Sequence, residues 1–300
     1  MSRRDRGVTE AGVDDTIPLY ARAQAPTRPA AKPVDVPVIQ RPWRTCGFMA
    51  QVWVLTGRSL RAVFGDVRLV VFGVLQPVVL LLLFSQVFQS VGGLPGVAQY
   101  RGYVNFLVPA TLINIAMTTA MGSGVGVLAE IYTGWMGRLR TMPVFLISVL
   151  VARTLADAVR LAAQLVATVA VAVAVLGFRP GDALGMVGAI GLALLVGWGL
   201  SWVFVAIATW QRKPETMQAV SFIVMFPLMF GSSAYMPPAA MPTWMRVVAT
   251  INPVTYAIDA TRCLALGRPV GAALVLAVAL VAVTASLGAV AAARNVRRNR

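Results

Sequence analysis

The chain has 300 residues, of which 58% are hydrophobic and 12% are charged, and its formal net charge is +15. A soluble domain of this size needs charged residues to cover its surface, so this composition excludes an ordinary soluble protein and indicates a lipid environment. There is no histidine, which removes the commonest general base and the commonest metal ligand. The basic residues flank the apolar stretches and do not line one groove, so nucleic acid is not the expected partner.

Residues 1–42 have the composition of a disordered cytoplasmic tail. They carry six prolines among charged and small residues, and no apolar run is long enough for a signal-peptide core. Such a tail serves solubility or attraction to anionic lipids, and a regulatory role is the alternative.

Residues 43–65 follow with the pattern of an amphipathic helix. Arg44, Gln51 and Arg58 recur one heptad apart. Apolar residues occupy another face of the same helix, namely Met49, Trp53, Leu60 and Phe64. A basic face beside membrane spans predicts a helix that lies along the membrane surface. Packing onto a partner helix is the alternative interpretation.

Residues 66–293 predict an all-α membrane domain of six transmembrane helices. A spanning helix needs about 20 consecutive apolar residues. The fifth span is expected to end near Gly231, because the prolines that follow would break a straight helix. The apolar stretches are 69–89, 103–129, 161–178, 183–211, 216–231 and 269–293. A basic cytoplasmic tail, residues 294–300, is expected after the sixth span.

The distribution of Lys and Arg predicts the orientation of these spans. With the N-terminus inside the cell, 21 of the 26 Lys and Arg residues fall on the inner side. The five on the outer side are Arg101, Arg179, Arg246, Arg262 and Arg268. Because inner loops carry the excess of positive charge, the sequence predicts a multi-pass protein of the inner or plasma membrane with both termini cytoplasmic.

The segment between the fifth and sixth spans, residues 235–266, is amphipathic and rich in proline. It carries Trp244, Arg246, Asp259 and Arg262, so it is too polar to span a membrane. Its apolar residues make an ordinary solvated loop equally unsuitable. We therefore expect short re-entrant helices that dip into the outer leaflet.

One group of charged residues lies within the third predicted helix. Arg153, Asp157 and Arg160 are spaced at i, i+4 and i+7, so the carboxylate can reach both guanidinium groups from one helical face. A gating or substrate-binding role is one interpretation. The other is a pair of snorkelling anchors with a local ion pair.

Glycines recur within the apolar stretches, as in Gly122, Gly124 and Gly126 of the second span and from Gly181 to Gly191 at the fourth. Small residues four apart allow helices to approach closely in lipid. A phosphate-binding loop is disfavoured, because no strand precedes these glycines and they lie in an apolar stretch.

No motif in the chain can bind the phosphates of ATP. A P-loop requires G-x-x-x-x-G-K-[ST], and neither Lys32 nor Lys213 follows such a loop. Any ATP hydrolysis must therefore come from another chain. Residues 130–143, EIYTGWMGRLRTMP, suit docking into a groove of a partner, although a plain interfacial loop would have a similar composition.

Two segments resemble the type 2 ABC-exporter permeases, in particular their daunorubicin-resistance-like branch. The segment GWMGRLRTMP resembles the family's cytoplasmic coupling stretch through Gly134, Trp135, Arg138, Leu139, Arg140 and Pro143. Residues 226–267 resemble the family's outer re-entrant region, with matches that include Pro237, Trp244, Asn252, Pro253, Asp259 and Arg262. The coupling stretch departs from the family pattern, since Gly137 stands where an acidic residue is usual and Leu139 where Phe is usual.

The resemblance implies the partners. Two permease chains, as a homodimer or a heterodimer, would pair with two ABC ATPase subunits that bind ATP and magnesium. This chain would then hold no cofactor, no metal and no catalytic residue. The helix over residues 43–64, with Arg44, Trp53 and Arg58, would lie on the inner surface, and residues 130–143 would receive the ATPase stroke.

The expected function is outward transport of a lipophilic or amphipathic small molecule, such as a drug or natural product, along a path enclosed by the spans of a permease dimer, with membrane lipids as further partners. Export of a lipid-linked glycan or complex cell-envelope lipid is the first alternative. An intramembrane transferase using Asp259 or Asp157 as a base is the second, although each carboxylate lies beside arginine residues. A scaffold or sensor that no longer transports is the third.

Overall fold

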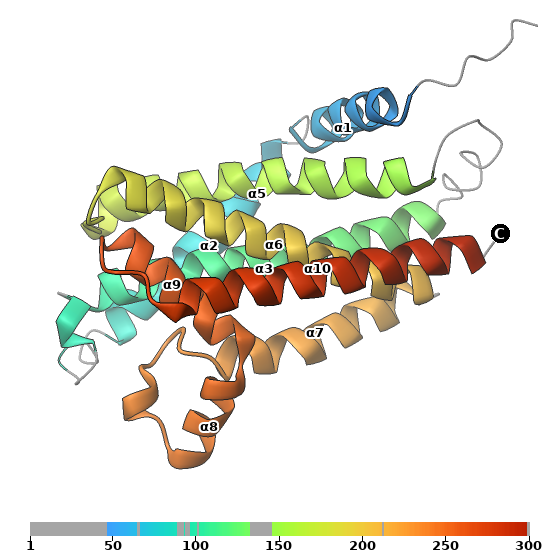
Figure 1. The fold of residues 1–300 in the computed structure, drawn as a ribbon. Helices are drawn as coiled ribbons and strands as arrows, with labels where there is room; N and C mark the ends of the chain where they lie inside the picture. Colours follow the sequence, from blue (N-terminus) through green and yellow to red (C-terminus); the bar gives the residue numbers. More distant parts are fainter. Residues whose placement is uncertain are drawn as a thin grey trace, which may run out of the picture. The chain divides into compact units, whose positions relative to one another are not determined.

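The computed structural model describes residues 47–64, 67–88, 93, 97–100, 102–132, 146–211 and 213–298, and within these ranges the regular structure is helical (Figure 1). The longer helices are α1 (Phe48–Phe64), α2 (Val67–Val87), α3 (Tyr103–Tyr132), α5 (Leu146–Leu176), α6 (Ala183–Trp210), α7 (Pro214–Phe230), α8 (Thr243–Ile251), α9 (Pro253–Ala265) and α10 (Ala272–Arg298). Two short 3₁₀ helices complete the set, η3 (Ala98–Tyr100) and η4 (Pro238–Ala240). The all-helical class expected from the sequence is therefore observed in the described residues.

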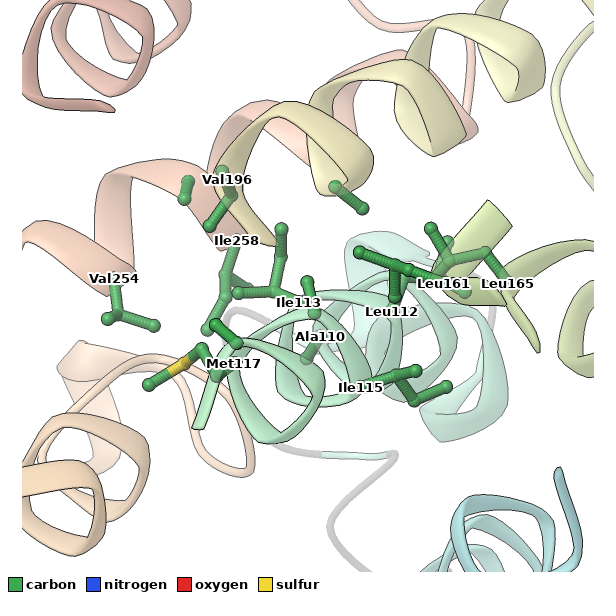
Figure 2. Close-up of a cluster of buried hydrophobic side chains, with 14 of the residues drawn as sticks. Ala110, Leu112, Ile113, Ile115, Met117, Leu161, Leu165, Val196, Val254 and Ile258 are labelled. Atoms are coloured by element: carbon green, nitrogen blue, oxygen red, sulfur yellow. The ribbon is translucent and has the colours of Figure 1, made fainter. Parts of the chain in front are cut away.

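Helix α3 is the centre of the bundle. It packs against α2, α5, α6, α7 and α9, and most of its length is buried. Helix α6 covers one side of α3 and packs on its other side against α10, so that α3, α6 and α10 run side by side (Figure 1). Figure 2 shows the core that results, in which Ile113 of α3, Val196 of α6 and Ile258 of α9 lie together. Since lipid tails are as apolar as these side chains, close packing between the helices is what holds such a core together in a membrane.

Among the described residues, four helices are long and apolar enough to cross a membrane. They are Tyr103–Tyr132, Ile147–Leu176, Ala183–Trp210 and Ala272–Asn295. The other two predicted spans appear as the shorter apolar helices Val71–Val87 and Pro214–Phe230. Helix α7 ends at Phe230, and the amide of Gly231 caps it by bonding to the carbonyl of Pro227 at 2.8 Å. The predicted end of the fifth apolar segment is therefore confirmed.

Two helix boundaries extend beyond the apolar stretches read from the sequence. Helix α5 begins at Leu146, so the charged residues from Arg153 to Arg160 lie inside it. Helix α10 continues to Arg298, through most of the segment expected to be a separate basic tail. Arginine is a good helix former, and positive charge near a helix C-terminus interacts favourably with the helix dipole, so this extension has a local cause.

Helix α1 packs along α5 through the face that contains Gln51. The Ser148 hydroxyl donates to Oε1 of Gln51 at 3.2 Å, and the Thr56 hydroxyl donates to the carbonyl of Ala152 at 3.4 Å. Gln51 is therefore buried, whereas Trp53 on another face is 78% exposed. Packing onto a partner helix is the alternative interpretation of this segment, and the helix that α1 packs against is α5 of the same chain. Arg44 lies outside the described residues.

The contact between α6 and α10 depends on a glycine. A Cβ atom built on Gly288 would lie 2.7 Å from the carbonyl carbon of Trp202, in the backbone of α6. Gly199 on the facing helix is similarly close to Val281 of α10. These two positions show the close helix approach that small residues permit.

We expect Gly288→Ala to lower the free energy of unfolding by about 1–3 kcal/mol, because the new methyl group meets backbone that cannot rotate away. Gly191→Ala is the matched control, since Gly191 lies in a helix and has open space around it. Alanine is the better helix former by about 1 kcal/mol, so the control should be neutral or stabilising. Thermal unfolding in detergent measures both, and equal melting temperatures would contradict the close contact.

Candidate functional site

A cavity of about 460 Å³ lies between α2, α3, α5 and α7. This volume is in the range of pockets that hold drug-sized ligands. Helices α2 and α7 supply mainly apolar lining, including Leu80, Leu81, Phe84, Phe222, Met225, Phe226 and Met229. Helices α3 and α5 supply polar lining, including Thr111, Asn114, Thr118, Thr119, Arg160 and Gln164. The cavity is thus amphipathic, with one apolar and one polar side.

The polar side is held in place by bonds between helices. The Thr119 hydroxyl of α3 donates to Oε1 of Gln164 on α5 at 3.2 Å. At another point, Nδ2 of Asn114 donates to the Tyr235 hydroxyl at 3.1 Å, and the Tyr103 hydroxyl donates to the carbonyl of Tyr235 at 3.2 Å. Tyr235, which follows α7, is therefore fixed against α3 at the edge of the cavity.

Aromatic rings follow one another along the apolar side of the cavity and beyond it. We call this series the aromatic ladder, and each ring contacts the next with centroids 4.5–6.1 Å apart. In order, the rings are Phe222, Phe226, Phe230, Tyr235, Phe84, Phe88, Tyr103, Phe106 and Tyr100. The ladder therefore runs from α7, beside the cavity, to Tyr100 in η3.

A buried charge cluster lies between α3 and α5. Asp157 is 3% exposed, and its Oδ2 accepts from the Ser123 hydroxyl at 2.5 Å and from Nε of Arg153 at 3.3 Å. Its Oδ1 lies 3.5 Å from Nη2 of Arg160. Arg153 also pairs with Glu130 of α3. The spacing on α5 does bring both guanidinium groups to one carboxylate, as the sequence predicted.

Two glycines of α3 lie beside these arginines, and Gly126 makes room for one of them. A Cβ atom on Gly122 would meet Nη2 of Arg160 at 3.7 Å, and one on Gly126 would run into the guanidinium of Arg153. Gly124, between them, instead faces Phe204 of α6 and Met217 of α7. The glycine run therefore packs helices, as expected, and in addition accommodates a charged side chain.

A second buried arginine ties α9 to the rest of the bundle. Arg262 is 2% exposed, and its Nε donates to the carbonyl of Phe106 at 2.9 Å. Its Nη2 donates to the carbonyl of Ser233 at 2.6 Å, and its Nη1 pairs with Asp259 at 2.9 Å. The guanidinium also lies over the Phe106 ring, 3.6 Å from its centroid. Arg262 thus joins α9, α3 and the turn after α7.

Asn252 joins the end of α7 to the start of α9. Its Oδ1 accepts from the amide of Val254 at 2.9 Å, which caps α9. Its Nδ2 donates to the carbonyls of Leu228 and Gly231 at 2.8 and 2.9 Å. Pro253 is the first residue of α9, where its missing amide hydrogen costs nothing. The Asn-Pro pair therefore sets where α9 begins.

The comparison with known proteins decides the family. The family model described as ABC-2 type transporter matches residues 50–266. The chain belongs to the ABC-2 type transporter family. It is 32% identical over 219 residues to the daunorubicin resistance ABC transporter permease protein of Streptomyces coeruleorubidus, which covers 71% of this chain and 76% of that protein. The resemblance found in the sequence is confirmed.

More distant relatives have similar names. The probable doxorubicin resistance ABC transporter permease protein of Mycobacterium tuberculosis is 25% identical over 226 residues, which cover 74% of this chain and 79% of that protein. A putative transport permease of Pyropia yezoensis is 26% identical over 194 residues, 64% of this chain and 66% of that protein. Transporter permease names, together with apolar helices long enough to span, identify a membrane component of a transporter.

This ABC-2 chain brings some predicted site residues together and leaves others apart. Arg153, Asp157 and Arg160 form one cluster, and Asp259 and Arg262 another. Pro237 precedes η4, and Trp244 on α8 is 71% exposed. Neither residue belongs to either cluster. The predicted coupling residues lie outside the described residues, namely Gly134, Trp135, Arg138, Leu139, Arg140 and Pro143.

Sequence reasoning missed the partners that these clusters recruit from other helices. Glu130 and Ser123 complete the cluster around Asp157, and Ser233 and Phe106 complete that around Arg262. Ser123 lies within the glycine run, which was a detectable signal for a polar contact in an apolar helix. The remaining contacts depend on how the helices pack.

Proposed function

We propose that this chain is the membrane subunit of an ATP-driven exporter that moves a lipophilic or amphipathic small molecule outward. The observation that carries the proposal is the cavity between α2, α3, α5 and α7, with its apolar and polar sides. Such a lining suits a ligand that has an apolar body and a few polar groups. The drug-resistance names of the relatives support a small lipophilic substrate.

The transport unit pairs two such permease chains, alike or different, with two copies of a separate ABC ATPase that binds ATP and magnesium. Residues 130–143 receive the ATPase movement, with Arg138 and Arg140 in that contact. Helix α1 lies at the cytoplasmic surface of the inner or plasma membrane, both termini are cytoplasmic, and α2, α3, α5, α6, α7 and α10 are the six spans. The segment from η4 to α9 is then the outer re-entrant region. Rocking of one permease chain against the other opens the cavity to alternate sides.

The charge cluster around Asp157 is the gating element in this proposal. It joins α3 to α5, the two helices on either side of residues 133–145. Movement of that segment would be transmitted to the helices that supply the polar side of the cavity. Both oxygens of Asp157 already contact arginine or serine groups, so this carboxylate is better suited to holding helices than to acting as a base.

Export of a lipid-linked glycan or complex envelope lipid is the second candidate, and the aromatic ladder favours it. Sugar rings and aromatic groups both bind well to aromatic side chains, and four rings of the ladder line the cavity, namely Phe84, Phe222, Phe226 and Tyr235. The rings farther along the ladder, such as Tyr103 and Phe106, are buried in the core and do not extend this surface.

The test is transport by the chain reconstituted in vesicles with its ATPase. We expect lipophilic compounds to stimulate ATP hydrolysis and to be transported, and Arg138→Glu to abolish both. Arg179→Glu is the control, an equal charge reversal at an exposed position. Unchanged stimulation in Arg138→Glu would contradict the coupling role.

Filling the cavity tests the binding site separately. Thr118→Trp adds an indole to the cavity lining, where it occupies volume that the substrate needs, and should reduce transport about tenfold or more. Co-purification of the variant with the ATPase shows that the complex still forms. Wild-type transport by this variant would exclude the cavity as the substrate site, and stimulation by lipid-linked glycans but not by drugs would favour the second candidate.

A further inference from the structure

The cavity has one charged side chain among its lining residues within the described part of the chain, and it is a cation. Arg160 extends from α5 into the polar side, where Gln76, Gln164, Thr118 and Thr119 are its uncharged polar companions. No described residue of the lining is acidic. The field inside the cavity therefore favours an anion over a cation.

The guanidinium of Arg160 is incompletely satisfied by its ion-pair partner. Its Nη2 lies 3.5 Å from Oδ1 of Asp157, and within the described residues its Nε atom is buried and has no hydrogen-bond partner. Asp157 is meanwhile bound by Ser123 at 2.5 Å and by Arg153 at 3.3 Å. The one nearby carboxylate is thus shared, and Arg160 retains an unused donor.

An unused buried donor is unusual, because a buried N–H group without a partner costs free energy that a bound oxygen atom restores. A guanidinium binds carboxylate and phosphate oxygens especially well, since its N–H groups match their geometry. Across the cavity, Phe222, Met225, Phe226 and Met229 of α7 present an apolar surface. An anionic head at Arg160 and an apolar body against α7 would satisfy both sides together.

We propose that the cavity binds amphipathic anions, with a carboxylate or phosphate head at Arg160 and an apolar body along α7. This inference rests on the proposed function, since it names the substrate class for the same cavity. A free lipophilic acid and the headgroup of an anionic lipid share this chemistry. The volume of about 460 Å³ accommodates the head and a large part of an acyl chain or ring system.

The experiment uses the full chain in phosphatidylcholine nanodiscs and a stearic acid probe that carries a photoactivatable diazirine. After illumination, mass spectrometry identifies the labelled peptides. We expect label on the peptide from α7, and stearic acid to displace the probe at least about tenfold better than octadecylamine of equal chain length, as a charge-assisted hydrogen bond predicts. Dioleoyl phosphatidic acid in the nanodiscs distinguishes the two sources, because competition by it identifies a lipid headgroup as a ligand.

Three variants locate the head. Arg160→Gln should reduce labelling of α7 about tenfold, and Arg160→Lys should restore part of it, since the charge returns without the planar donors. Arg179→Gln removes the same charge from an exposed position and should label like the wild type. If Arg160→Gln does not fold, the competition series on the wild type still decides the question.

Two results would overturn the inference. One is equal competition by octadecylamine and stearic acid, and the other is unchanged labelling in a folded Arg160→Gln. Label on α7 without charge preference would remove the anion inference and leave the cavity as the proposed substrate site. Label that avoids all cavity peptides, while the reconstituted complex transports other compounds, would place the substrate site elsewhere.

Discussion

Replacing Arg262 with methionine should lower the free energy of unfolding by about 3–5 kcal/mol, because several buried backbone carbonyls lose their donor at about 1–3 kcal/mol each. Arg262 is 2% exposed and donates to Asp259 and to the carbonyls of Phe106, Ser233 and Ala234. Methionine fills much of the same volume but donates no hydrogen bond. We expect the variant to accumulate poorly and to melt well below the wild type in detergent.

Arg246→Met is the matched control for this prediction. Arg246 also donates to backbone carbonyls, those of Pro238, Ala239 and Met241, but it is exposed. Water replaces its bonds, so the same substitution should cost about 1 kcal/mol or less. Arg262→Lys should be intermediate, since lysine keeps the charge and loses the planar donors. Equal melting temperatures for Arg262→Met and Arg246→Met would contradict the role of burial.

What the sequence predicted correctly was set by local periodicity. The contacts of Asp157 with Arg153 and Arg160 follow from spacing along one helix. The end of α7 at Phe230 followed from the prolines beyond it. These features depend on residues within about two helical turns of each other.

What the sequence could not predict depends on which helix faces which. The bond from Arg262 to Phe106 joins positions 156 apart, and nothing in either segment identifies the other. Gln51 shares its heptad spacing with Arg58, yet Gln51 is buried against α5 whereas Arg58 is exposed. The cavity likewise lies between four helices, and the hydropathy of a segment does not predict which helices it packs against or where they leave space.

The glycine run shows how a correct prediction can be incomplete. Glycine in an apolar helix predicts close packing, and Gly124 does pack closely against Phe204. Gly122 and Gly126 belong to the same glycine run, but their neighbours are the guanidinium groups of Arg160 and Arg153, respectively. Close helix packing and room for a long charged side chain leave the same signature in the sequence.

Replacing Asp157 with asparagine should destabilise the chain by an amount similar to that for Arg262→Met. Two arginines on one face of α5 then lose their shared carboxylate, and in the described structure Glu130 remains as a partner of Arg153. Asparagine has nearly the same shape, so the loss is that of charge and not of volume. We expect a decrease of about 3–5 kcal/mol in the free energy of unfolding, as for other uncompensated buried charges.

Glu130→Gln provides the comparison, because Glu130 also pairs with Arg153 but its side chain is 28% exposed. Water screens the more exposed position, so this variant should lose less than Asp157→Asn. The double variant Arg153→Gln with Asp157→Asn should lose less free energy of unfolding than the two single variants lose in sum, since it removes both opposite charges together. Arg153 should couple to Asp157 more strongly than Arg160 does, because its Nε is hydrogen-bonded at 3.3 Å whereas Arg160 lies at 3.5 Å. Additive losses in this cycle would show that the cluster is not the joint between α3 and α5 that the gating proposal requires.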